Sequence, residues 1–87
     1  MGRKRDKFLD KLYSKPKDFK WSELQTLLKG LGYEELQGSG SRVKFYLESP
    51  RSIISLHKPH PEETLKPYMI KYIIESLKEI GVYHGDD

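Results

Sequence analysis

Residues 42–47 alternate between polar and apolar side chains, and this alternation restricts the fold more than any other feature of the chain. The apolar positions, which would share one face of a strand, are Val43, Phe45 and Leu47. The positions between them, which would share the opposite face, are Arg42, Lys44 and Tyr46. A period of two with one apolar face indicates a β-sheet that is buried on one side and open on the other.

A second strand is expected at residues 52–57, after a turn at Glu48–Arg51 that contains a proline. If this turn is the whole loop, Leu47 lies opposite Ser52, and the remaining pairs follow. The apolar pairs are Phe45 with Ile54 and Val43 with Leu56. The polar pairs are Lys44 with Ser55 and Arg42 with His57. Because a shift of one residue would mix the two faces, the pattern predicts this antiparallel register.

An amphipathic helix is expected before the strands. Ser22 and Gln25 form a capping-box pattern at its start, and Gly30 and Gly32 offer left-handed positions for its end. Its apolar side chains, at helical spacing, are Leu24, Leu27, Leu28 and Leu31. A short strand is then expected at Tyr33–Leu36, followed by a glycine-containing turn at residues 37–41.

The last helix is expected to begin near Pro67, because proline is favoured at the first helical position, and to end before Gly81. Its apolar stripe consists of Met69, Ile70, Ile73, Ile74, Leu77 and Ile80. The sequence therefore predicts a compact α+β fold of order α-β-β-β-α, in which two helices cover one face of a three-stranded antiparallel sheet.

The first 20 residues differ in charge from the rest of the chain. Their basic side chains are Arg3, Lys4, Arg5, Lys7, Lys11, Lys15, Lys17 and Lys20, whereas the C-terminus ends in Asp86 and Asp87. Apolar residues at helical spacing within residues 7–13 predict a short helix that Pro16 ends. We expect residues 1–20 to form a basic N-terminal extension and residues 21–83 to form a single α/β domain.

Composition excludes several classes of protein. The 87 residues contain no cysteine, which removes disulfides, thiolate catalysis and cysteine-based zinc sites and fits a cytoplasmic protein. No apolar stretch approaches the roughly 20 residues that span a bilayer, and the N-terminus lacks a signal-peptide apolar region, so no membrane contact is expected. The net charge of +3 suits a polyanionic partner without requiring one.

His57 and His60 are the side chains best suited to proton transfer, because imidazole can act as base or acid near neutral pH. Their spacing could also suit a metal, but Pro59 and Pro61 prevent a helix there and no cysteine is available, so we expect no metal and no other cofactor. For His60 the alternative is a structural role in the loop before the last helix. His84, near the C-terminus, is expected to be a surface residue.

The segments Gly40-Ser41-Arg42-Val43-Lys44-Phe45 and Lys58-Pro59-His60-Pro61, followed by an amphipathic helix, resemble the HicA toxin family. The order of elements agrees with that family from Ser22 to Gly81. The resemblance implies a fold like that of double-stranded-RNA-binding domains, activity as a ribosome-independent mRNA interferase, and neutralisation by a HicB antitoxin that covers the active face. The family usually has a catalytic histidine after the Gly-Ser pair, where this chain has Arg42. Arginine stays protonated and cannot serve as a base, but it can hold a phosphate through two hydrogen bonds.

Two hypotheses follow for the function. In the first, the protein is an RNA-directed toxin of a toxin–antitoxin pair, with metal-independent endoribonuclease activity or a degenerate remnant of it. His57 would replace the family base, His60 would act as acid or orient the loop, and the residues that bind RNA would be Ser41, Arg42, Lys44 and Lys58. In the second, Arg42 marks an inactive protein, and the same basic face is a non-catalytic module that binds RNA or a protein.

Overall fold

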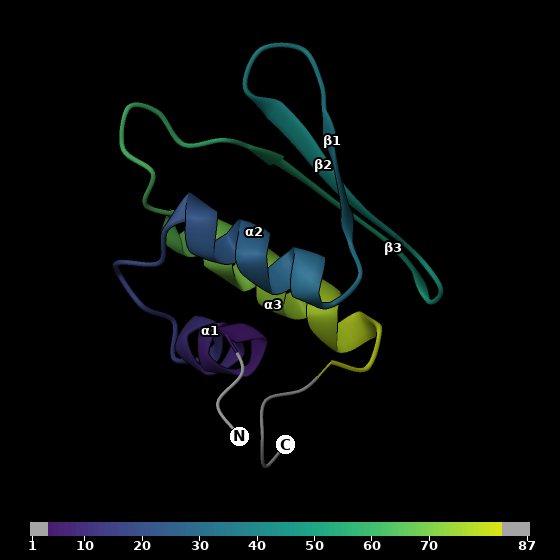
Figure 1. Ribbon diagram of the computed structural model, residues 1–87. Helices are drawn as coiled ribbons and strands as arrows, with labels where there is room; N and C mark the ends of the chain where they lie inside the picture. Colours follow the sequence, from purple (N-terminus) through teal and green to yellow (C-terminus); the bar gives the residue numbers. More distant parts are fainter. Residues whose placement is uncertain (1–3, 83–87) are drawn as a thin grey trace.

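The computed structural model describes residues 4–82, which fold into three layers (Figure 1). The helices are α1 (Lys4–Tyr13), α2 (Trp21–Gly30) and α3 (Pro67–Glu79), and the strands are β1 (Glu34–Gln37), β2 (Arg42–Glu48) and β3 (Arg51–His57). The strands form one antiparallel sheet in the order β1-β2-β3, and α2 and α3 cover one face of it. This confirms the predicted α+β fold. Helix α1 packs on α2 and α3 on the side away from the sheet.

The register of β2 and β3 is the one that the alternation predicts. The apolar pairs are Val43 with Leu56 and Phe45 with Ile54, and the polar pairs are Lys44 with Ser55 and Arg42 with His57. All four apolar side chains are buried, and all four polar ones are exposed. The ladder extends one pair further than expected, to Glu48 and Arg51, so the turn consists of the two residues between them.

The start of α2 differs from the prediction. Lys20 is the N-cap, and its backbone N–H donates to Oε1 of Glu23 at 2.9 Å. Ser22 lies inside the first turn, so the capping box expected from Ser22 and Gln25 was wrong. Burial explains the shift: the indole of Trp21 is only 1% exposed, and its ring centroid lies 5.8 Å from that of Phe45.

The end of α2 confirms one of the two expected glycine positions. Gly32 has a φ of +105°, and its N–H donates to the Lys29 carbonyl at 3.1 Å. The N–H of Tyr33 donates to the Leu28 carbonyl at 2.9 Å, which completes a Schellman motif. Because this bond ties Tyr33 to the helix end, β1 begins at Glu34, one residue later than predicted.

One hydrophobic core includes residues from all three layers. Leu12 of α1 and Phe19 of the following segment are fully buried in it, and Phe8, Leu9 and Tyr13 pack against it. Helix α1 therefore contributes to the same core as the sheet, and it begins at Lys4, earlier than the pattern at residues 7–13 predicts. Arg3, His84, Asp86 and Asp87 lie outside the described residues. Within residues 4–82, no helix has the length and apolar character needed to cross a membrane.

Candidate functional site

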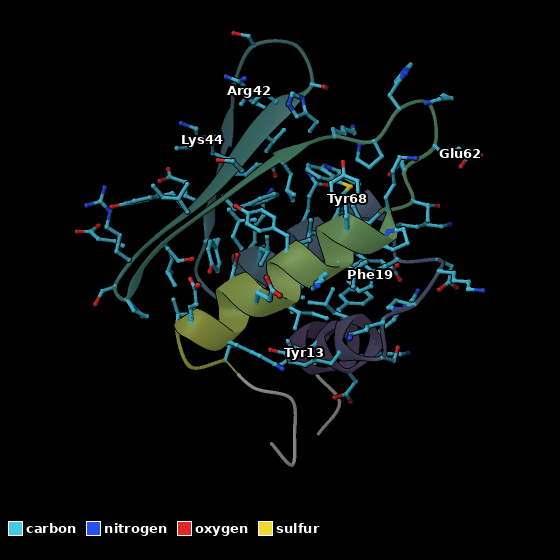
Figure 2. The ribbon with its side chains drawn as sticks, turned by 180° about the vertical axis from the view of Figure 1, so that it is seen from behind. Tyr13, Phe19, Arg42, Lys44, Glu62 and Tyr68 are labelled. Carbon is cyan, nitrogen blue, oxygen red and sulfur yellow. The ribbon has the colours of Figure 1, made fainter. Side chains whose placement is uncertain are left out.

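The open face of the sheet carries the predicted site at the end where β2 begins and β3 ends. Because Arg42 lies opposite His57 and Lys44 lies opposite Ser55, the antiparallel register brings these side chains together. They line an open hollow of about 260 Å³, which also contacts Leu56. Figure 2 shows Arg42 and Lys44 along β2, on the side away from α3.

Ser41 holds the imidazole of His57. Its Oγ lies 3.3 Å from Nδ1 of His57, within hydrogen-bond distance. The N–H of Lys58 donates to the Ser41 carbonyl at 2.8 Å, which continues the pairing of the two strands beyond Arg42 and His57. In the tautomer in which Nδ1–H donates to Ser41, Nε2 keeps its lone pair available to a substrate.

Gly38 allows the backbone to close tightly around Arg42. Its N–H donates to the Arg42 carbonyl at 2.8 Å, and the Arg42 N–H donates to the Ser39 carbonyl at 3.1 Å. A Cβ at Gly38 would lie 3.2 Å from that Arg42 oxygen and 3.3 Å from the Arg42 Cβ. A side chain at Gly38 would therefore displace Arg42. Gly40, with a φ of +61°, supplies the left-handed residue of the same turn.

His60 lies in a different hollow, of about 160 Å³, on the segment that follows β3. The residues that line this hollow are Pro59, His60, Pro61, Glu62, Thr64 and Lys66. Within residues 4–82, the imidazole of His60 forms no hydrogen bond, either with His57 or with the backbone of its own loop. The structure thus brings His57 together with Ser41, Arg42 and Lys44, and it does not bring His60 to the same place.

The positive charge of the site is not neutralised within the fold. In the described part of the chain, Arg42, Lys44 and Lys58 have no carboxylate oxygen within 4.0 Å. Lysines elsewhere do: Lys11 lies 3.0 Å from Glu23, and Lys29 lies 3.3 Å from Glu35. Among residues 4–82, no group of three or more histidine, cysteine, aspartate or glutamate side chains is arranged to hold a metal ion. The site can therefore attract and hold phosphate with fixed cations.

Comparison with known families decides the classification. The family model described as the HicA toxin of bacterial toxin–antitoxin systems matches residues 21–82. The chain belongs to the HicA toxin family. A HicA toxin acts within a toxin–antitoxin pair, so an antitoxin partner is implied. The matched region begins at the first residue of α2, and α1 lies before it. Searches of curated proteins and of solved structures found no match.

The sequence predicts Ser41 only as an RNA-binding residue, and its contact with His57 was not predicted. The predicted register held a signal for it, because Ser41 is adjacent to Arg42, the residue opposite His57. The role of Gly38 was also missed, since a glycine in a turn does not reveal which neighbour approaches it.

Proposed function

We propose that this HicA family protein is a toxin that cleaves mRNA at the hollow between Arg42 and His57. The observation that carries the proposal is the position of His57, opposite Arg42 on the open face, with its Nδ1 beside Ser41. A base held next to a phosphate-binding cation is what cleavage of RNA by its own 2′-hydroxyl requires. Membership of a toxin family supports this assignment.

In the proposed reaction, Nε2 of His57 removes the proton from the 2′-hydroxyl. The 2′-oxygen attacks the adjacent phosphorus, the bond from phosphorus to the 5′-oxygen breaks, and water protonates the departing 5′-oxygen. The products are a 2′,3′-cyclic phosphate and a 5′-hydroxyl. Arg42 binds the non-bridging oxygens and stabilises the charge that develops on them, and Lys44 and Lys58 hold the flanking phosphates. This chemistry uses no metal ion.

Cleavage of a single-stranded RNA by the full-length chain, with a chelator present, tests the proposal. The wild-type protein should yield 2′,3′-cyclic phosphate ends, and His57→Ala should lower the rate by about 10²- to 10⁴-fold. His60→Ala is the matched control and should keep most of the activity. Full activity in His57→Ala would remove His57 from the mechanism. A wild-type protein that binds RNA without cutting it would be a non-catalytic module, in which Arg42 only holds phosphate.

We further propose that a HicB-like antitoxin neutralises the toxin by covering this basic face. The unpaired charges of Arg42, Lys44 and Lys58 favour an acidic partner surface. If so, Arg42→Glu combined with Lys44→Glu should weaken the complex with a purified HicB-like antitoxin. Unchanged affinity in this double variant would show that the antitoxin binds another face of the toxin.

A further inference from the structure

A larger hollow, of about 340 Å³, lies between the α1–α2 connection and the start of α3. The residues that line it are Lys15, Pro16, Lys17, Pro67, Ile70 and Lys71. The prolines and Ile70 provide an apolar surface, and the three lysines surround it with positive charge. In the described part of the chain, none of these lysines has a carboxylate oxygen within 4.0 Å.

Backbone contacts connect this hollow to the site at His57. The N–H of Trp21 donates to the Glu63 carbonyl at 2.7 Å, and the N–H of Leu65 donates to the Phe19 carbonyl at 2.8 Å. The α1–α2 connection and residues 58–66 therefore lie side by side, at the same end of the molecule (Figure 1). Residues 58–66 begin next to His57 and end next to Pro67, so this one short segment joins the two hollows.

Lys15 has a backbone conformation that its side chain disfavours. Its φ is +55°, and its N–H donates to the Leu12 carbonyl at 3.0 Å, just after α1 ends. Glycine or asparagine is usual at such a position, and the backbone of any other residue there is strained. What lysine adds at this position is an ammonium group at the edge of the hollow.

We propose that this hollow is a second RNA contact, which holds a nucleotide outside the cleavage site. The base would lie on the apolar surface of Pro16, Pro67 and Ile70, and its flanking phosphates would bind the three lysines. Single-stranded nucleic acid binds where a positively charged groove follows the phosphates and an apolar surface supports the bases. Aromatic side chains usually provide that surface, and the two prolines and Ile70 would provide it here. The inference rests on the proposed function, because it assigns the hollow to the same RNA that reaches His57.

RNAs of two lengths test the inference, with 2′-O-methyl sugars to prevent cleavage. One has about four nucleotides and fills only the site at His57, and the other has about sixteen and can reach both hollows. The triple variant Lys15→Gln, Lys17→Gln, Lys71→Gln should bind the longer RNA about 10- to 100-fold more weakly and the short RNA as wild type does. Its salt slope for the longer RNA should fall by about 2, since each phosphate contact on a single strand contributes about 0.7.

The matched control is Lys7→Gln, Lys29→Gln, Lys78→Gln, which removes the same charge from lysines that line neither hollow. It should change the affinity for the longer RNA by less than about threefold, because lysines that line neither hollow make no direct phosphate contact and salt screens their remaining effect. An equal loss in both triple variants would show that only net charge matters and would overturn the inference. Normal binding of the longer RNA by the variant Lys15→Gln, Lys17→Gln, Lys71→Gln would also overturn the inference. If the variant of the hollow lost antitoxin binding and kept RNA binding, the hollow would be a contact for the antitoxin and not for RNA.

The acidic residues on the segment between the two hollows allow a second test of the proposed RNA path. Glu62 and Glu63 are exposed, and Figure 2 shows Glu62 pointing away from the molecule. Because an RNA that spans both hollows passes these carboxylates, Glu62→Gln with Glu63→Gln should strengthen binding of the longer RNA several-fold and leave the short RNA unaffected. No gain with the longer RNA would contradict a spanning path. If the wild-type protein bound neither RNA, the proposed function itself would fail, which is a different outcome from a failure of the second contact.

Discussion

Oγ of Ser41 lies 3.3 Å from Nδ1 of His57, so a residue just before β2 orients an imidazole at the end of β3. The contact leaves Nε2 as the nitrogen that can meet a substrate. In the proposed reaction, Ser41 is thus a positioning residue, and the base depends on it for its orientation and tautomer.

Removing the Ser41 hydroxyl should slow cleavage without weakening RNA binding. Ser41→Ala should lower the single-turnover rate by about 10-fold, which corresponds to about 1.4 kcal/mol, the size of one hydrogen bond. Ser41→Thr keeps a hydroxyl and should restore most of the rate. RNA affinity, measured in parallel, should stay within about twofold of wild type, since one neutral hydroxyl adds no counterion release. A rate in Ser41→Ala equal to that of wild type would remove the positioning role.

A methyl group at Gly38 should disturb Arg42 specifically. In Gly38→Ala the new Cβ meets the backbone oxygen and Cβ of Arg42 at 3.2 and 3.3 Å, so the strand start must shift. We expect RNA affinity to fall by about 3- to 10-fold, as expected for one weakened phosphate contact. Gly40→Asn is the control, because nothing lies within 4 Å of a Cβ at Gly40 and asparagine tolerates its left-handed φ. Equal affinity in the two variants would contradict this account of Gly38.

Truncating Phe45 should cost the domain much of its stability. The Phe45 side chain is fully buried between Trp21 and the sheet partner Ile54. Phe45→Ala should lower the free energy of unfolding by about 3 to 5 kcal/mol in urea titrations. Its neighbour Lys44 lies on the open face, and Lys44→Ala should change stability by no more than about 0.5 kcal/mol. A loss below about 1 kcal/mol in Phe45→Ala would be incompatible with this packing.

The sheet could be predicted because its faces differ sharply in polarity. Along β2 and β3, one register pairs Phe45 with Ile54 and places Arg42 beside His57, and a shift of one residue would bury charge. The start of α2 could not be predicted in the same way. The pattern at Ser22 is local, whereas the helix start depends on burial of Trp21 against a strand more than twenty residues away in the sequence.

The role of the N-terminal residues also depends on tertiary contacts. The sequence indicates a basic extension with a short helix, but it cannot show that Leu12 is fully buried in the common core. Deleting the extension would therefore remove core side chains together with charge. Substituting lysines separates the two effects, because variants of Lys15 and Lys17 lose charge and keep α1 intact.

Replacing Lys15 by glycine should stabilise the fold. The φ of +55° at Lys15 suits glycine, so Lys15→Gly should relieve strain on the order of 1 kcal/mol, less the greater entropy of glycine in the unfolded chain. We expect a net gain of about 0.5 kcal/mol in the free energy of unfolding, together with weaker binding of long RNA. Lys17→Gly, outside the left-handed region, should only destabilise. A destabilised Lys15→Gly would show that the backbone at this position is not strained.

Alkaline pH should destabilise the protein through Tyr33. Burial raises the pKa of its hydroxyl, its hydrogen bond to Oγ of Ser52 at 2.8 Å opposes this effect, and the nearby Tyr72 adds to it. Because the pKa is higher in the folded than in the unfolded chain, the stabilising contribution of neutral Tyr33 is complete below about pH 10 and is lost as the pH rises through the folded-state value.

The variant Tyr33→Phe cannot ionise at this position and serves as the reference. The difference in free energy of unfolding between wild type and Tyr33→Phe should therefore be constant from pH 7 to about pH 9.5, and above pH 10 it should shift against wild type by at most about 1.4 kcal/mol per pH unit. Lysines titrate in the same range, but they do so in both proteins and cancel in the comparison. Urea titrations at several pH values measure this difference, and a constant difference up to pH 11 would show that the Tyr33 hydroxyl ionises as easily in the fold as in the unfolded chain.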